Sequence, residues 1–229
     1  MVEVFALGIL EENGFLSSKE SLLELLPPEN RNFISRFRRN SSAQRSLFGE
    51  LLLRHVLGQR LGIDGKAIVF SKSKNGKPYL RASGIHFNLS HSGEYVAVAL
   101  SDHDTGIDVE QIRPVNYRIA ERFFSPEEVS VLNSKSGSSK LEYFFDLWTL
   151  KESYLKMIGT GLTRSLSSFT VEFVNGGFRM TEKSGSRKAE IFFKQYSIDD
   201  AYKLSVCSYN RSFSDEVVWI EAKDFFKLE

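Results

Sequence analysis

Cysteine is almost absent from this sequence of 229 residues, because Cys207 is the only one. A single thiol can form neither an internal disulfide nor a zinc site built from several cysteines. Proline and glycine are also scarce, with 5 and 16 residues, which excludes a collagen-like or low-complexity chain. With 41% apolar residues, the sequence predicts a folded globular protein with a sizeable core.

Neither sign of charge dominates, since 30 Lys and Arg oppose 29 Asp and Glu. Bulk attraction to nucleic acid or to an anionic membrane is therefore not expected. The longest unbroken apolar run, Tyr95–Leu100, is too short to cross a bilayer. Residues Met1–Leu10 carry Glu3 and no basic residue, unlike a signal peptide. We expect a cytoplasmic protein with no nucleic-acid or membrane partner.

The order of predicted elements indicates an α+β fold of two halves, residues 1–105 and 106–229, facing each other across a cleft. A polar break at Ser101–Gly106 separates them, and Asn133–Lys140 predicts a flexible surface loop. Hydrophobic periodicity and turn chemistry predict the following helices and strands. The helices are Glu29–Arg39, Ala43–Leu61, one from about Pro126, and Leu141–Ile158; the strands are His86–Leu89, Tyr95–Leu100, Ile107–Glu110, Ser168–Val174, Ala189–Tyr196 and Tyr202–Tyr209.

The strand at Gly106–Glu110 carries two carboxylates at alternate positions. Because side chains two apart on a strand point the same way, Asp108 and Glu110 lie side by side while Ile107 and Val109 face a core. Two adjacent anions attract a cation, and ligand sets made only of oxygen suit Mg²⁺. The solvated face of an edge strand has the same spacing, so this pattern alone leaves both interpretations open.

The segment Trp148–Lys156 places opposite charges one helical turn apart, at Glu152 and Lys156. Such a face can offer a carboxylate to a metal and an ammonium group to a phosphate. The same spacing is typical of an ordinary surface ion pair, worth about 0.3–0.5 kcal/mol.

Two polar turns complete the set of candidate segments. Ser90 and His91 lie at a strand end, where binding groups gather on rigidly held loops. A Ser–His nucleophile is not favoured, because adjacent strand side chains point to opposite faces and no nucleophile elbow surrounds them. Gly76-Lys77-Pro78 either holds a lysine beside an anion or only forms a hairpin turn. The sequence contains no P-loop, dinucleotide fingerprint or HExxH motif.

Taken in order along the chain, these segments closely resemble the motifs of the 4′-phosphopantetheinyl transferases. They are Gly76–Pro78, Phe87–Ser92, Gly106–Glu110 and Trp148–Lys156, the last (WxxKESYxK) being the most specific. The length and the two halves resemble the Sfp-type group, named for the surfactin-synthetase activator, rather than the half-length, trimeric acyl-carrier-protein synthases. The motifs extend from Gly76 to about Leu162, and weaker similarity reaches Pro28 and the C-terminus.

The resemblance implies a pseudo-twofold monomer of two similar halves, each a helix-plus-antiparallel-sheet unit, with coenzyme A and Mg²⁺ in the cleft. It implies transfer of the 4′-phosphopantetheine arm of coenzyme A to a serine of an apo acyl or peptidyl carrier protein, with release of 3′,5′-ADP. The N-terminal half is expected to hold the nucleotide, and the C-terminal half the metal and the carrier. The implied metal ligands are Asp108, Glu110 and Glu152; the implied contacts of coenzyme A and its phosphates are Arg45, Ser46, Lys77, Ser90, His91, Lys151 and Lys156.

The serine that attacks coenzyme A has to lose a proton, and a nearby carboxylate can accept it. Glu152 and Glu128 are the two candidates, and with Lys156 they form the expected catalytic set. However, Ser125-Pro126-Glu127-Glu128 is also a capping box, with Ser at the N-cap and Glu at N3, and capping alone explains Glu128.

One part of the family pattern is missing. The family often carries lysines near the N-terminus that meet the 3′-phosphate, and here those positions are Asn30 and Phe33. Arg31 and Arg36 are the candidates to replace them.

For the carrier protein we expect docking at Tyr117–Phe124, where Arg118 and Arg122 can face an acidic partner. The alternative is that the aromatic residues of this segment belong to the core. Two other functions stay open at this point: a different Mg²⁺-dependent phosphoryl-transfer or hydrolytic enzyme acting on a nucleotide, and a non-catalytic adaptor that binds carrier proteins. The presence of three carboxylates and Lys156 disfavours the adaptor.

Overall fold

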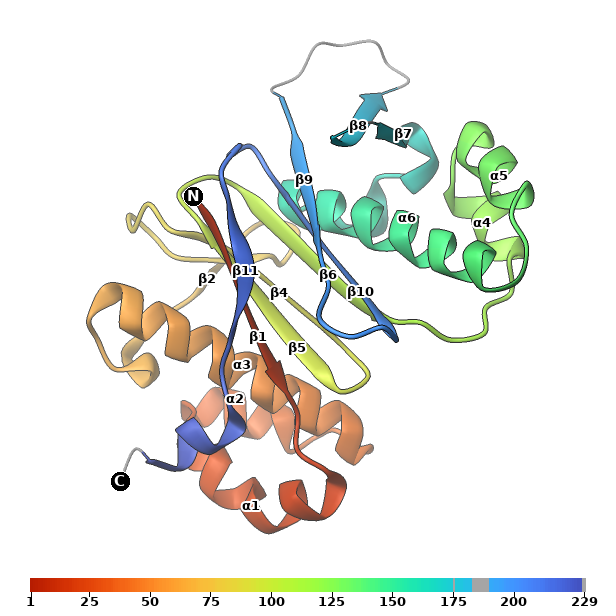
Figure 1. Ribbon diagram of the computed structural model, residues 1–229. Coiled ribbons are helices and arrows are strands. Elements are labelled where there is room, and N and C mark those ends of the chain that lie inside the picture. Colours follow the sequence, from red (N-terminus) through yellow and green to blue (C-terminus); the bar gives the residue numbers. More distant parts are fainter. Residues whose placement is uncertain (175, 183–189, 228–229) are drawn as a thin grey trace.

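In the computed structural model, which describes residues 1–174, 176–182 and 190–227, two main sheets lie side by side (Figure 1). The first has the strand order β11-β1-β5-β4 and the second β6-β10-β9. Their strands are β1 (Val2–Gly8), β4 (His86–Ser92), β5 (Tyr95–Ser101), β6 (Thr105–Gln111), β9 (Phe192–Tyr196), β10 (Tyr202–Ser208) and β11 (Phe213–Trp219). Two small hairpins pair β2 (Ser71–Lys72) with β3 (Pro78–Tyr79) and β7 (Phe169–Val174) with β8 (Gly177–Glu182).

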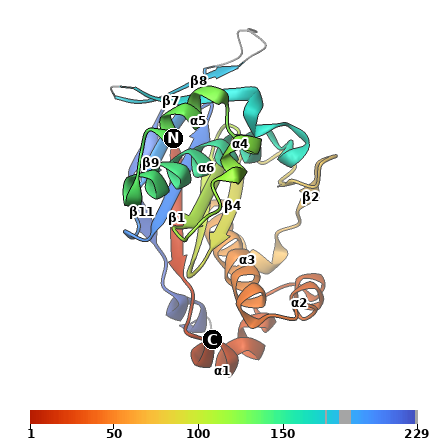
Figure 2. The same ribbon diagram turned by 90° about the vertical axis from the view of Figure 1, so that its right-hand side faces the viewer.

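One long helix packs on each sheet. Helix α3 (Asn40–Leu61) lies on the first sheet and α6 (Gly137–Ile158) on the second (Figures 1 and 2). Both have 22 residues, and both end at a glycine with φ of 66° or 67°, a left-handed conformation that favours glycine over other residues. The expected α+β fold of two halves is therefore confirmed. The remaining α-helices are α1 (Glu12–Glu24), α2 (Pro28–Ile34), α4 (Arg118–Phe123) and α5 (Pro126–Asn133). Short 3₁₀ helices lie at Gly65–Ala67, Gly161–Thr163, Leu166–Ser168 and Ala222–Lys227.

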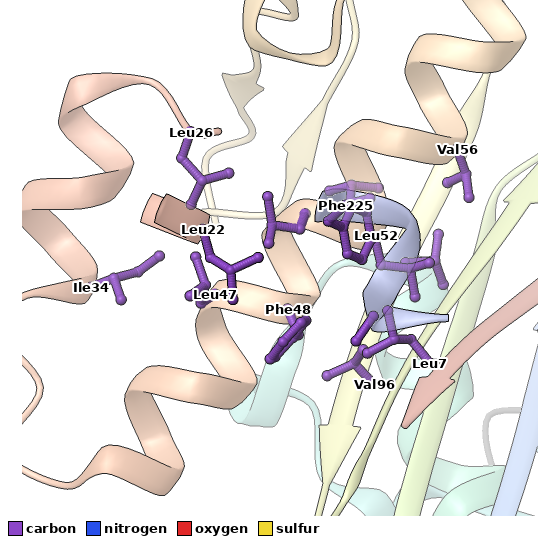
Figure 3. Close-up of a cluster of buried hydrophobic side chains, with 14 of the residues drawn as sticks. Leu7, Leu22, Leu26, Ile34, Leu47, Phe48, Leu52, Val56, Val96 and Phe225 are labelled. Carbon is purple, nitrogen blue, oxygen red and sulfur yellow. The ribbon is translucent and has the colours of Figure 1, made fainter. Parts of the chain in front are cut away.

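The core of the first half fills the space between α1, α2, α3 and the first sheet (Figure 3). Leu7 and Val96 come from strands, Phe48 and Leu52 from α3, and Phe225 from the far end of the chain, and all are buried. Burying a large apolar side chain contributes about 1.5–3 kcal/mol. This core therefore depends on residues more than 200 positions apart in the sequence.

The two halves of the structure are not separated by one boundary in the sequence. Strand β11 pairs in parallel with β1, so residues 213–219 complete the sheet of the first half. The expected boundary between residues 105 and 106 falls inside β6, which pairs with β10 of the second half. The hydrophobic pattern shows which residues are buried but not which strands pair, and for that reason this exchange was not expected from the sequence.

Several predicted elements differ in extent. The predicted loop Asn133–Lys140 is wrong, because α6 already begins at Gly137, and its first turn is exposed, where Ser and Lys are tolerated. The helix predicted over Glu29–Arg39 ends at Ile34. Ala189 of one predicted strand lies outside the described residues. No helix in the described part of the chain combines the length and apolar character needed to cross a bilayer.

Candidate active site

The adjoining edges of the two sheets, β4 and β6, carry the central acidic residue of the candidate site. Asp108 on β6 is only 4% exposed. Its Oδ1 accepts hydrogen bonds from Lys156 Nζ at 2.6 Å and from Ser90 Oγ at 3.0 Å. Its Oδ2 is buried and has no hydrogen-bond partner among the described residues. Burial raises the pKa of this carboxyl, and the adjacent Lys156 opposes that rise.

Glu110 lies two residues further along β6, and its Oε2 accepts a hydrogen bond from Ser92 Oγ at 2.7 Å. The predicted alternation therefore places both β6 carboxylates against serines of β4. Burial raises the pKa of Glu110, and the negative charge of Asp108 raises it further. Ser92 was not selected from the sequence, although the alternation Asn88-x-Ser90-x-Ser92 contained the signal.

Helix α6 brings Glu152 and Lys156 to the same place. Lys156 bonds to Asp108 and to Ser90 (2.8 Å) rather than to Glu152, so the ordinary surface ion pair considered from the sequence is not formed. Glu152 is half-buried and makes no hydrogen bond or ion pair with the described residues. Burial raises its pKa to about 7, and the negative charges of Asp108 and Glu110 add to the rise.

This arrangement fits a hard divalent cation chemically. Asp108 has a buried oxygen without a partner, and the carboxylate of Glu152 has no ion-pair partner among the described residues. Both carboxylates and that of Glu110 repel one another, so a positive charge between the three is favoured. Within residues 1–174, 176–182 and 190–227, no three His, Cys, Asp or Glu side chains already converge closely enough to surround an ion. The charge at Asp108 Oδ1 is instead compensated by the Lys156 ammonium group.

Positively charged side chains stand next to this cluster. Desolvation lowers the pKa of His91, and the nearby positive charges of Arg45 and Lys156 lower it further. Arg45 on α3 also donates a long hydrogen bond of 3.4 Å to the Gly93 carbonyl oxygen in the turn after β4. Ser46, the next residue of α3, is half-buried, and no hydrogen bond of its side chain is seen in the described structure.

Lys77 joins the two halves. Its Nζ donates to the carbonyl oxygens of Met157 at 2.8 Å and Thr105 at 3.3 Å. Desolvation lowers the pKa of this ammonium group. The same side chain borders a cavity of about 420 Å³ that is also lined by His86 and Asp104. Lys77 therefore extends from the predicted turn to the end of α6, where its ammonium group is already bonded to backbone carbonyl oxygens.

Two expected site residues lie in the core instead. Lys151 and Glu128 are 0% and 1% exposed and form an ion pair of 2.7 Å. Lys151 also donates to the Phe169 carbonyl oxygen, which leaves its ammonium group no exposed surface for a phosphate. Glu128 accepts from the Ser125 amide, so the capping box is confirmed. The expectations of a phosphate contact at Lys151 and a catalytic base at Glu128 are corrected accordingly.

Of the two arginines expected to replace the missing family lysines, Arg36 is exposed and Arg31 is half-buried. Arg31 uses its guanidinium group on the carbonyl oxygens of Leu26 and Glu24. Asn30 accepts a long hydrogen bond from Arg54, and Phe33 is 59% exposed. Arg36 is exposed and makes no ion pair with the described residues, so it remains the candidate from the sequence.

Comparison with known proteins matches both halves to one family. The sequence model described as "4'-phosphopantetheinyl transferase superfamily" matches residues 104–207, and "4'-phosphopantetheinyl transferase, N-terminal" matches residues 16–103. The chain is similar to 4′-phosphopantetheinyl transferase psf-1 of Bacillus pumilus, with 36% identity over 219 residues and 94% of each chain covered. It is also similar to 4′-phosphopantetheinyl transferase Sfp of Bacillus subtilis (strain 168), with 34% identity over 206 residues that cover 90% of this chain and 92% of Sfp.

The boundary between the two matches lies next to the strand that carries the acidic motif. The two family models meet between residues 103 and 104, directly before β6, which carries two of the three carboxylates. The chain therefore belongs to the 4′-phosphopantetheinyl transferase family and is an enzyme of its Sfp-type group, which transfers phosphopantetheine from coenzyme A to carrier proteins.

Proposed function

We propose that the junction of β4, β6 and α6 is the site where this enzyme performs its reaction. The serine hydroxyl of an apo carrier protein attacks the pyrophosphate of coenzyme A. A bond forms between the serine oxygen and the phosphorus of the phosphopantetheine arm, and the bond to 3′,5′-ADP breaks. One observation carries the proposal: three carboxylates lie close enough to one another and to Lys156 to interact electrostatically. They belong to Asp108, Glu110 and Glu152.

The reaction moves negative charge between phosphoryl oxygens, so positioning and charge stabilisation contribute more than a covalent intermediate. In this proposal Asp108, Glu110 and Glu152 would hold Mg²⁺, which would supply positive charge at the pyrophosphate. Lys156 supplies a second positive charge on the same side.

The proton of the attacking serine needs an acceptor. With Glu128 enclosed in the core, Glu152 is the remaining candidate.

We place the rest of coenzyme A along the N-terminal half. Arg45 and Lys156 lie close enough to His91 for their positive charges to lower its pKa, and two such charges suit phosphate groups. Ser46 follows Arg45 on α3, and Lys77 borders the cavity of about 420 Å³. We also place Ser90 beside the phosphates of coenzyme A, because its hydroxyl accepts a hydrogen bond from Lys156.

For the carrier protein we propose the exposed face of α4. Phe124 is buried, and Phe123 packs edge-on against Trp148 with ring centroids 5.9 Å apart, so the aromatic residues belong to the core. Arg118 and Arg122 remain exposed and can meet an acidic carrier protein.

The experiment is to incubate the enzyme with coenzyme A, Mg²⁺ and an apo carrier protein, and to weigh the carrier by mass spectrometry. We expect the carrier to gain the mass of one phosphopantetheine arm, and no gain on a carrier whose acceptor serine is replaced by alanine. Asp108→Asn should lose the transfer while staying folded. A different phosphoryl-transfer enzyme would convert a nucleotide without changing the carrier, and an adaptor would bind the carrier without changing its mass. Either result would contradict the proposal.

A further inference from the structure

The edges of the two sheets are joined by side chains of β4 rather than by a shared backbone ladder. Along β4, every second side chain from Asn88 to Ser92 accepts a hydrogen bond from the amide of every second residue of β6 from Ile107 to Gln111. The three bonds run from Ile107 N to Asn88 Oδ1 (3.0 Å), from Val109 N to Ser90 Oγ (3.2 Å) and from Gln111 N to Ser92 Oγ (3.2 Å). We call these three bonds the side-chain seam.

The seam has a constant offset of 19 residues, so the two strands run in the same direction along it. Ile107 and Val109 are 0% and 1% exposed. A buried amide without a partner costs about 1–3 kcal/mol. Side-chain oxygens of β4 therefore take the place that carbonyl oxygens of a neighbouring strand would fill.

Two bonds of the seam continue to a carboxylate. Ser90 donates to Asp108 Oδ1 at 3.0 Å, and Ser92 donates to Glu110 Oε2 at 2.7 Å. A serine hydroxyl has one proton and two lone pairs. Because an ionised carboxylate can only accept, the serine donates its hydroxyl proton to the carboxylate while a lone pair accepts the amide of β6. The third member, Asn88, contacts no carboxylate in the described structure.

We infer that Ser92 is a positioning residue, which holds Glu110 in the orientation that the cation site needs. The inference rests on the proposed function, because it takes Glu110 as a ligand of the cation. Ser90 plays the corresponding part for Asp108, but it also accepts from Lys156, so its replacement would disturb two interactions. Within the described residues, the Ser92 hydroxyl hydrogen-bonds only to the Gln111 amide of the seam and to Glu110, which makes Ser92 the cleaner test.

Ligands of a metal are usually oriented by a second set of hydrogen bonds, and losing one of these lowers metal affinity or activity by about 10–100-fold. We therefore expect Ser92→Ala to raise the Mg²⁺ concentration for half-maximal transfer by about 10-fold or more, with little change in the KM for the carrier protein. Ser92→Thr, which keeps the hydroxyl, should restore the Mg²⁺ dependence. Asn88→Ala is the matched control, because it removes a bond of the same seam without touching a carboxylate. It should lower the melting temperature and leave the Mg²⁺ dependence unchanged.

Direct metal binding provides a readout that does not depend on turnover. Mn²⁺ binding in the presence of coenzyme A, followed by electron paramagnetic resonance, should weaken by a similar factor in Ser92→Ala and not in Asn88→Ala. If Ser92→Ala does not fold, Ser92→Cys, with a weaker donor of similar size, should show the same direction of change. Equal Mn²⁺ binding in wild type, Ser92→Ala and Ser92→Cys, or an equal loss in Asn88→Ala, would overturn the positioning role and leave the proposed function standing. A wild-type enzyme that binds no Mn²⁺ would overturn the metal site itself and this role with it.

Discussion

Lys151 and Glu128 form an ion pair of 2.7 Å in which both side chains are enclosed. Lys151 directly precedes Glu152 in α6, while Glu128 caps α5 and accepts the amide of Val171 in β7. The pair therefore ties three elements together immediately behind the candidate site. It links α6, which carries Glu152 and Lys156, to α5 and β7.

Removing one partner of this pair leaves the other charge buried without compensation. We expect Lys151→Met to lower the free energy of unfolding by about 3–5 kcal/mol, measured by urea denaturation. The double variant Glu128→Gln with Lys151→Met should cost less than the two single losses together, because it buries no lone charge. Normal stability of Lys151→Met would show that the pair is open to solvent.

Glu152 should affect the rate rather than the fold, whereas Lys156 should affect both, because it also compensates the charge of the buried Asp108. Loss of one electrostatic contact to shifting charge costs about 2.7–4 kcal/mol of barrier, or roughly 10²–10³ in rate. We expect falls of that size for Glu152→Gln and Lys156→Met in the carrier mass assay. Added Mg²⁺ should rescue Glu152→Gln only in part, and Lys156→Met, which keeps the three carboxylates, should still bind the metal. Near-normal turnover in both variants would remove these residues from the site.

Charge reversal on α4 tests the carrier surface. Because Arg118 and Arg122 are exposed and make no ion pair with the described residues, replacing both with Glu should change the stability by less than about 1 kcal/mol. We expect a raised KM for an acidic carrier protein and an unchanged KM for coenzyme A. An equal effect on both substrates, or none, would place docking elsewhere.

The far end of the chain should stabilise the first half. Phe225 is 3% exposed and lies 6.5 Å from Phe48, measured between ring centroids. Phe225→Ala should therefore cost about 3–5 kcal/mol in thermal or chemical unfolding. Trp219→Ala is a suitable control, because Trp219 is 48% exposed and its loss should cost much less.

The sequence was most informative where function constrains local spacing. The alternation at Asp108 and Glu110 and the helical spacing of Glu152 and Lys156 predicted the faces that the structure brings together. The two long helices and the strands around the midpoint were also predicted, because their periodicity is strong over many residues.

What the sequence did not supply depends on contacts between distant segments. In the sequence, Lys151 looks like an ordinary surface lysine. Its structural role becomes visible only in the fold, where it is buried and bonded to Glu128 and to the Phe169 carbonyl oxygen. The partner of Lys156 is likewise on another strand rather than on its own helix. Local periodicity does not predict such pairings, because they depend on which elements pack together.

The parallel pairing of β11 with β1 has a consequence for synthesis on the ribosome. Roughly a hundred residues separate Ser101 from Phe213, and their translation takes roughly 5–20 s at about 5–20 residues per second. During that interval β1 can pair with β5, but the edge of β1 that β11 covers in the folded protein has no partner yet. An open strand edge recruits strands from other chains. Chaperones that shield strand edges, and the speed of translation through the second half, therefore influence how much of this enzyme reaches its native fold.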